Sequence, residues 1–318
     1  MDYIFVARSK KGGGFGDDPA TSHFVAVPGN ANAILYKHKI KKNDWRKAVM
    51  DAAQGGTPNP MTTGDIVFYV HGFNNSQKTV LERHRKIKKG LAAQGFNGVV
   101  VSFDWPSGDV ALNYLEDRDK AKAAAHQLVT EGIALFAKLQ EPDCRVDMHI
   151  LAHSMGCFVV REAFDDADDR TAIAARSWAV SQVMLLAADL SVHSLDAGNT
   201  RSFALYKHCA RLTNYYNPRD EVLSVSAVKR AGVERRAGRV GLDKPPTDKA
   251  ANVYCGEHFK TAYPKLPVDA QQSHAWYFDD EVLMQDVFYT ISGGLDRNEF
   301  PTRGVTDQGN LSLQKPES

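Results

Sequence analysis

The stretch Ile150-Leu-Ala-His-Ser-Met-Gly-Cys-Phe158 decides how the rest of the chain is interpreted. An apolar run typical of a buried strand ends at Ala152, and a helix-like run starts at Gly156. Ser154 therefore lies in a tight bend between a strand and a helix. This pattern is typical of G-x-S-x-G, in which a strained turn exposes a serine hydroxyl at the carboxyl end of a sheet. Ala152 replaces the first glycine, and its single methyl group is small enough for such a bend.

The sequence around this bend alternates between short apolar runs and longer amphipathic ones. Runs rich in β-branched residues predict strands, with two weaker candidates given last: 65–70, 98–103, 146–152, 182–188, 211–216 and 252–255. Segments with a 3.6-residue period predict helices at 78–93, 112–139, 156–164 and 281–291. Strands that alternate with helices indicate an α/β fold, a mostly parallel sheet covered by helices on both faces.

The two ends of the chain lie outside this alternation. Residues 1–32 contain the apolar runs YIFVA and HFVAV and predict a β-leader. The Gly-rich KKGGGFGDD between them is not followed by a helix, as a phosphate-binding loop would be, so we expect a surface loop. Residues 298–318 are polar and contain Pro and Gly, which predicts a loosely ordered tail. The sequence thus predicts one domain over residues 1–297.

The composition excludes several classes of protein. The chain has 318 residues, of which 43% are hydrophobic and 24% charged, as in ordinary globular proteins. A formal net charge of +1 gives no indication of a nucleic-acid or anionic-membrane partner. The basic stretch 229–239 lacks interleaved aromatic residues, so we expect a solvated face or loop there. No stretch approaches the roughly 20 apolar residues of a membrane-spanning helix.

The cysteines and the N-terminus indicate a compartment. The four cysteines are scattered and form no C-x-x-C pair, which is typical of reduced thiols. The first residues, MDYIFVARSKK, lack the basic segment and the longer apolar run of a signal peptide. Together these features predict a cytoplasmic protein.

A serine hydroxyl becomes an effective nucleophile only when a base accepts its proton and donors stabilise the oxyanion that forms. For the donors, the strand at 65–70 runs directly into His-Gly-Phe-Asn-Asn-Ser at 71–76. Gly72 allows a sharp turn that would point the Phe73 amide inward. The second donor would be the amide of Met155, at a helix N-terminus.

The same segment also fits an ordinary strand, turn and helix, with Asn75 or Ser76 as the helix N-cap. The two interpretations are compatible. His71 and Asn74, which border the expected centre, are candidate pocket residues.

An orienting acid should follow the serine in the chain and precede the base. Asp220, in Asn-Pro-Arg-Asp-Glu beyond the strand at 211–216, is the first candidate, because turn residues at the carboxyl end of a strand can project a carboxylate toward a histidine. Asp189, which follows the strand at 182–188, is the rival. A turn or capping role is the alternative for either residue.

The base should lie in a loop between the last strand and the terminal helix. His274, in Gln-Gln-Ser-His-Ala-Trp-Tyr-Phe at 271–278, fits this position, and His258 is the second choice. His153, beside the serine, is expected to pack near the bend. Trp105, which follows a strand in Asp-Trp-Pro, is a candidate apolar wall of the pocket.

Taken together and in this order, YVHGFNNS, SFDWPSG, LAHSMGCF, LAADL, NPRDEVL and SHAWYF resemble the α/β-hydrolase fold, and specifically the serine-hydrolase family DUF900. The resemblance covers residues 3–291. It implies a sheet of about eight strands and a catalytic triad of Ser154, Asp220 and His274. Where the family often has a Pro, this chain has an Ala-Asp pair at 188–189, which leaves the role of Asp189 open.

The expected reaction is acyl transfer to water. His274 would deprotonate Ser154, the serine would attack a carbonyl carbon, and Asp220 would orient the imidazole. An ester or thioester is favoured over an amide because its leaving group departs more easily, and the partner would be a small-molecule acyl substrate. The sequence has no H-x-E cluster, so no metal and no cofactor are expected.

Two alternatives stay open: an amidase or peptidase with the same triad, and a hydrolase-fold binding protein without turnover. The segment 189–208 has no clear place in the core and is a candidate lid. The sequence makes no prediction of the oligomeric state.

Overall fold

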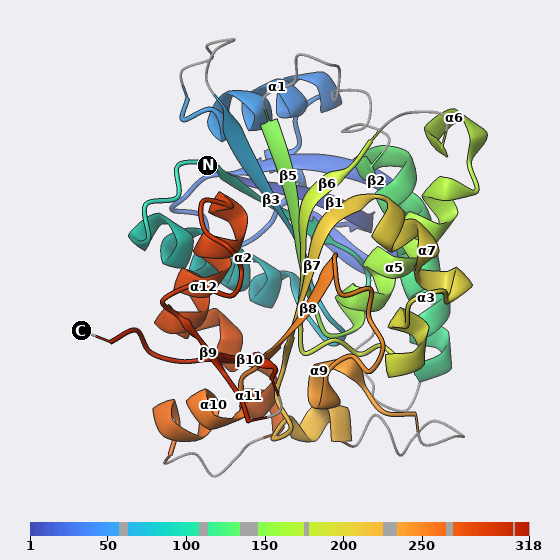
Figure 1. The fold of residues 1–318 in the computed structure, drawn as a ribbon. Coiled ribbons are helices and arrows are strands. Elements are labelled where there is room, and N and C mark those ends of the chain that lie inside the picture. Colours follow the sequence, from blue (N-terminus) through green and yellow to red (C-terminus); the bar gives the residue numbers. More distant parts are fainter. Residues whose placement is uncertain are drawn as a thin grey trace.

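The computed structural model describes residues 1–56, 63–107, 114–133, 146–174, 178–224, 234–264, 270–307 and 309–317. Its described strands form one sheet in the order β2-β1-β4-β3-β5-β6-β7-β8-β10-β9 (Figure 1). The strands are β1 Asp2–Lys11, β2 Gly14–Val27, β3 Gly64–Val70, β4 Val99–Asp104, β5 Val146–His153, β6 Val180–Leu186, β7 Cys209–Tyr216, β8 Ala250–Tyr254, β9 Arg303–Val305 and β10 Leu311–Leu313.

The sheet is parallel from β1 through β8 and on to β10. The described antiparallel pairs, β1 with β2 and β10 with β9, lie at its opposite edges. This arrangement confirms the predicted fold class. The sheet has ten described strands where about eight were expected, and the two additional strands come from the C-terminal tail.

Helices cover both faces of the sheet. Those described are η1 Tyr36–His38, α1 Lys42–Ala53, α2 Gln77–Ala93, α3 Tyr114–Gln127, the π-helical η2 Leu128–Ile133, α5 Met155–Asp168, α6 Thr171–Ala174, η3 Val192–Leu195, α7 Thr200–Lys207, α9 Ala237–Val240, α10 Gly256–Ala262, α11 Ala270–Ala275, η4 Trp276–Phe278 and α12 Glu281–Ser292. Helices α2 and α12 lie on one face, and α3, α5 and α7 lie on the other (Figure 1).

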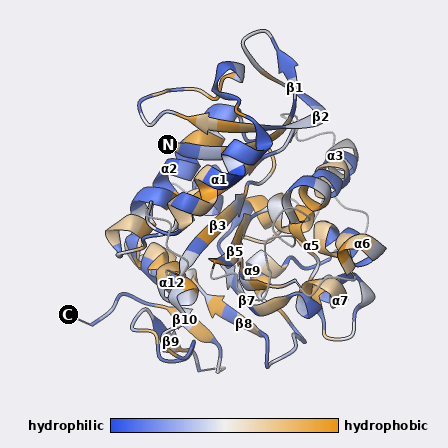
Figure 2. Ribbon diagram, turned by 90° about the horizontal axis from the view of Figure 1, so that it is seen from above, coloured by the Kyte–Doolittle hydropathy of each residue, from blue (hydrophilic) through white to orange (hydrophobic). Residues whose placement is uncertain are grey.

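The central strands are continuous apolar runs because both of their faces are covered. Residues 66–70 of β3 and 99–103 of β4 are all buried. Hydrophobic residues concentrate along these central strands and α5, whereas the outer end of the β1–β2 hairpin is hydrophilic (Figure 2). The core thus holds the strand ends, and the residues just beyond them, in fixed positions.

Most helix predictions agree with the structure. Helices α2, α5 and α12 lie where the 3.6-residue period placed them. The expected helix at 112–139 is described at 114–133 as α3 followed by η2, and its two ends lie outside the described residues. None of the helices in the described ranges is long and apolar enough to cross a membrane.

The leader is a β-hairpin made of β1 and β2. Its Gly-rich segment is not the surface loop that we expected, because residues on both sides of the turn at Gly12–Gly13 continue the two strands. Gly12 has a φ of 57°, which glycine adopts without strain and which closes the hairpin. Strand β1 pairs in parallel with β4, so the hairpin extends the sheet beyond β4.

The C-terminal tail differs from the prediction of a loose segment. Its described residues include β9 and β10, and β10 pairs with β8. Buried Arg303 anchors it, with its Nη2 2.7 Å from Asp286 Oδ1 in α12 and its Nε 2.9 Å from Oδ2. The hydroxyl of Thr302 donates to the same carboxylate at 2.7 Å, as does that of Tyr215 at 2.6 Å. Composition gave no sign of this long-range ion pair.

The segment 189–208, the candidate lid, lies in the crossover from β6 to β7 and contains η3 and α7. Its role as a lid stays a prediction. Ala204 and Leu205 of α7 are buried in the same core cluster as residues of α5, and the Tyr206 hydroxyl donates to the Leu195 carbonyl at 2.7 Å. A helix of eight residues is too short to show a clear period, which is why the sequence did not place it in the core.

Candidate active site

The bend at Ser154 has the strained geometry that the sequence pattern predicts. Ser154 follows β5, precedes α5, and has φ 56° and ψ −125°, a region that non-glycine residues rarely occupy. Its amide donates to the Leu186 carbonyl at 2.9 Å, and its carbonyl accepts from the Asp189 amide at 3.2 Å. The end of β6 therefore holds the bend in place.

Two glycines allow the chains to approach one another here. A Cβ on Gly156 would lie 2.4 Å from the Val70 carbonyl oxygen and 2.5 Å from that of His71. A Cβ on Gly72 would lie 2.7 Å from the Cβ of Ser154. A side chain at Gly156 would displace the backbone at the end of β3, and one at Gly72 would displace Ser154. Both positions therefore require glycine.

A carboxylate in the turn after β7 pairs with a histidine of helix α11. The Nδ1–H of His274 donates to Asp220 Oδ2 at 2.7 Å, and both side chains are buried. Asp220 Oδ1 accepts from the Leu223 amide at 2.9 Å, which fixes the rotation of the carboxylate. This geometry places the hydrogen of the His274 ring on Nδ1, so that the neutral ring carries a lone pair on Nε2.

His274 also contacts the strand that carries the serine. The Nε2–H of His153 donates to the His274 carbonyl at 2.8 Å, and the centres of the two rings are 4.7 Å apart. The structure thus brings His153, the residue next to Ser154, into contact with His274, the residue that pairs with Asp220. His274 lies in the last turn of α11, not in the loop that was expected.

Ser273 is a site residue that sequence reasoning missed. Its hydroxyl donates to the Ala270 carbonyl at 2.8 Å and accepts from the Glu221 amide at 3.2 Å. It therefore ties α11 to the turn that carries Asp220. A serine next to the candidate base was the available signal, but a hydroxyl at that position gives no indication of its partner.

The loop after β3 is held by Asn75, a second residue whose role was missed. Its side-chain Nδ2 donates to the carbonyls of Gly72 at 2.8 Å and Phe73 at 3.0 Å. Asn74, between Phe73 and Asn75, has φ 52°, which Asn tolerates better than most residues. Asn75 is buried, and Ser76 is the N-cap of α2, accepting from the Thr79 amide at 3.2 Å. The loop and the helix start are therefore fixed by different side chains.

His71 and Trp105 pack together beneath this loop. The Nδ1–H of His71 donates to the Gly72 carbonyl at 2.8 Å, and its Nε2 accepts from the Trp105 amide at 3.1 Å. The indole stacks on the imidazole and donates to the His71 carbonyl at 2.8 Å. Trp105 is fully buried and packs beneath the loop, and its role as an apolar wall of the pocket stays a prediction.

A buried ion pair connects His71 to the β1–β2 hairpin. Arg8 Nε lies 2.7 Å from Asp104 Oδ1, and the same oxygen lies 3.4 Å from His71 Nε2. Burial raises the pKa of Asp104, but the charge of Arg8 and the contact with His71 more than offset it, so this pKa is lowered. Burial lowers the pKa of His71 despite Asp104. His71 is therefore a neutral supporting group.

The rival residues have other partners. Asp189 Oδ1 lies 3.4 Å from the Nε of buried Arg236, which belongs to the basic stretch that was expected to be solvated. Residues 229–233 of that stretch lie outside the described residues. His258 Nε2 lies 2.9 Å from Asp280 Oδ2. Asp220 is thus the carboxylate bonded to His274, and His258 belongs to a separate pair.

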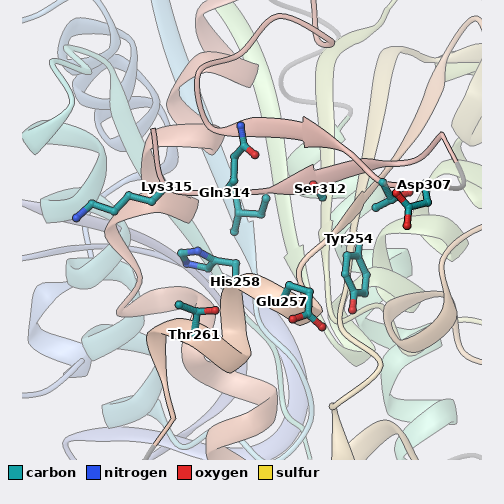
Figure 3. Close-up of a pocket in the computed structure, with 10 residues that line it drawn as sticks. Tyr254, Glu257, His258, Thr261, Asp307, Ser312, Gln314 and Lys315 are labelled. Carbon is teal, nitrogen blue, oxygen red and sulfur yellow. The ribbon is translucent and has the colours of Figure 1, made fainter. Parts of the chain in front are cut away.

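A groove of about 530 Å³ lies between α10 and the tail strands (Figure 3). Its lining residues include Tyr254, His258, Asp307 and Lys315, and do not include Ser154, Asp220 or His274. The groove is therefore distinct from the candidate site. In the part of the chain that the structure describes, no group of three or more His, Cys, Asp or Glu residues is arranged to hold a metal ion.

Comparison with solved structures gives distant likenesses. One is to a metagenome-derived lipolytic enzyme of the pair LipS and LipT, with 12% identity, coverage of 60% of this chain and 83% of the other, and a TM-score of 0.33. A metagenomic carboxyl esterase shares 15% identity over 63% of this chain and 55% of its own, with a TM-score of 0.26. The phospholipase PlaB from Legionella pneumophila shares 14% identity over 65% and 40%, with a TM-score of 0.27. Overlap at this level carries no information on the substrate.

Comparison with curated proteins found no match. The model of one protein family, described as an alpha/beta hydrolase of unknown function (DUF900), matches residues 59–256. That match covers more than half of the chain, including β3, the Ser154 bend and Asp220. The chain belongs to the DUF900 family of α/β hydrolases.

Proposed function

We propose that the protein is a serine hydrolase that cleaves a carboxylic ester or thioester through an acyl-enzyme on Ser154. The observation that carries the proposal is the 2.7 Å bond between His274 Nδ1 and the buried Asp220 carboxylate, on a helix hydrogen-bonded to the residue before Ser154. A buried carboxylate that orients an imidazole is the arrangement that an activated serine requires of its base, which supports the proposal.

The proposed reaction begins with proton transfer from Ser154 Oγ to His274 Nε2. The Asp220 carboxylate holds the tautomer in which Nε2 is free and stabilises the imidazolium that forms. The serine oxygen then bonds to the carbonyl carbon of the substrate. The imidazolium returns the proton to the departing alcohol or thiol, and water repeats the sequence to release the acid and regenerate the serine.

The negative charge on the carbonyl oxygen needs donors that are already in place. We assign this role to the backbone amides of Phe73 and Met155. Met155 is the first residue of α5, so its N–H has no acceptor within the helix. The Asn75 side chain fixes the loop that carries Phe73. Removing one such donor costs about 2.7–4 kcal/mol in other hydrolases.

The test is intact-mass measurement after treatment with a fluorophosphonate, which reacts with activated serines. We expect one adduct on the wild-type protein and none on Ser154→Ala. A folded wild-type protein that forms no adduct would contradict the proposal and leave a binding protein without turnover. Matched ester, thioester and amide substrates with the same acyl group would then identify the bond that is cleaved, and faster amide cleavage would contradict the ester assignment.

A further inference from the structure

His153 links Ser154 and His274, two residues of the proposed site. It is the last residue of β5, directly before Ser154, and is 1% exposed. Its Nε2 lies 2.8 Å from the carbonyl oxygen of His274. Because a carbonyl can only accept, Nε2 carries the hydrogen and the ring donates. Through this bond the main chain of the proposed base is attached to the residue beside the nucleophile.

The other side of the ring faces the loop after β3. A Cβ on Gly72 would lie 3.1 Å from His153 Nδ1, so the ring nitrogen and the loop backbone are close neighbours. Nδ1 is buried and has no hydrogen-bond partner within the described residues. The imidazole therefore makes one directional bond, and this bond goes to His274.

Aromatic rings surround His153 and limit its rotation. The ring of Phe278 lies 5.1 Å from it, edge to face, and that of Tyr277 lies 6.3 Å away. Burial, followed by the charges of His274 and Arg83, holds the pKa of His153 well below its ordinary value, although the bond to the His274 carbonyl opposes this. A neutral ring adds no positive charge beside the imidazolium that forms on His274 in the reaction.

We propose that His153 is a positioning residue, which fixes the backbone of His274 relative to Ser154 through its Nε2–H bond to the His274 carbonyl. The inference rests on the proposed hydrolase function. His274 itself is then held at two points, the side chain by Asp220 and the main chain by His153, while Ser273 ties α11 to the Asp220 turn. Without the His153 bond α11 would be tied to the turn that carries Asp220 but not to the strand that carries Ser154, and a displacement of about 1 Å in such a site can reduce the rate by about a hundredfold.

The experiment compares three substitutions at this position. His153→Phe keeps an aromatic ring but removes the donor. His153→Gln keeps an N–H at the same number of bonds from the Cβ, whereas the amide of His153→Asn is one bond shorter and does not reach the carbonyl. The matched control is His149→Phe, since His149 lies on the same strand, is equally buried and bonds to Asp65, away from the site.

The readout is the rate of fluorophosphonate labelling at increasing probe concentration, which separates the maximal rate from the concentration that gives half of it. We expect His153→Phe and His153→Asn to lower the maximal rate by about 10- to 100-fold with the half-maximal concentration unchanged. His153→Gln should retain at least about a fifth of the wild-type rate, and His149→Phe should label like the wild type. If His153→Phe does not fold, the Gln and Asn pair gives the same comparison.

Several results would overturn the inference. Labelling of folded His153→Asn at the wild-type rate would show that the bond is not needed. Equal losses in the Gln and Asn variants would assign the effect to ring packing, and an equal loss in His149→Phe would assign it to general weakening of β5. Absence of labelling in the wild type would instead contradict the proposed hydrolase, so the two failures are distinguishable.

Discussion

The bend at Ser154 and the C-terminal tail both depend on buried polar groups, but the two regions were not equally visible in the sequence. The bend is built from contiguous residues whose types follow from local geometry: a small residue, the serine, and Gly156 where a Cβ would meet the β3 backbone. The tail depends on Arg303 and Asp286, which are 17 positions apart and join different elements. Local constraints leave a readable pattern, whereas one long-range ion pair leaves none.

The two regions also differ in what they contribute to the molecule. Ser154 is held in a strained conformation, which costs about 1–3 kcal/mol that the surrounding structure must supply. The pair of Arg303 and Asp286 is fully buried and fixes the last strands to α12. Substitutions around the bend should therefore change activity more than stability, and substitutions in the tail should do the reverse.

The largest effect is expected for Asp220→Asn. The amide cannot hold His274 in the reactive tautomer, and in another serine hydrolase the equivalent change lowers kcat by about 10⁴-fold. The labelling rate of Ser154 should fall by a similar factor, while the urea midpoint of unfolding should change little, because Asn retains an acceptor for the Leu223 amide.

The control is Asp189→Asn, because Asp189 pairs with Arg236 and not with His274. Its labelling rate should stay within about tenfold of the wild type. A loss in this variant as large as that in Asp220→Asn would contradict the assignment of the acid.

The tail provides the opposite case in Arg303→Met. Removal of the guanidinium leaves Asp286 buried without its charge partner, which typically costs about 3–5 kcal/mol. Urea unfolding should show this loss, and the protein that remains folded should label at the wild-type rate. The double variant Arg303→Met with Asp286→Leu should recover part of the stability, because no buried charge remains. Unchanged stability in the single variant would show that the tail is not anchored by this pair.

Much of the fold followed from the sequence because its signals are periodic. Strands β3 to β8 and helices α2, α5 and α12 have runs long enough for a period of 2 or 3.6 to be recognised, or are continuously apolar because they are buried on both faces. Helix α7 and strands β9 and β10 are too short for this, so the sequence did not indicate a helix in the crossover or paired strands in the tail.

The candidate site was predictable where chain order constrains it. Ser154, Asp220 and His274 follow the order expected of the fold, and the structure bonds the second of them to the third. The supporting groups were not predictable. The Asn75 side chain donates to main-chain carbonyls, and the Ser273 hydroxyl accepts from the Glu221 amide, which is distant in the sequence. Many residue types are compatible with such bonds, so residue type alone does not identify the partner.

Acid should destabilise the protein through its buried histidines. Burial lowers the pKa of His71, His84 and His153 in the folded protein. The unfolded chain takes up protons near its ordinary value of about 6.5, while the folded protein does not. Stability is therefore complete above about pH 6.5 and declines below it, by up to about 1.4 kcal/mol per pH unit for each histidine that stays neutral.

Urea unfolding at pH 8, 7, 6 and 5 measures this slope. His153→Gln removes one of the three groups, so its stability should fall less steeply below pH 6.5 than that of the wild type. An identical slope in the two proteins would show that His153 does not titrate differently in the folded and unfolded states.

The smallest effect is expected at Ser76, whose hydroxyl caps α2. Ser76→Ala should lower the free energy of unfolding by about 1 kcal/mol and leave the labelling rate unchanged. The neighbouring Asn75→Ala should instead slow labelling by about tenfold or more, because the loop that carries Phe73 loses both side-chain bonds. Urea unfolding and labelling measure the two effects. As with the bend and the tail, one position should change mainly activity and its neighbour mainly stability. Slowed labelling in Ser76→Ala would mean that the helix start, and not Asn75, holds the loop.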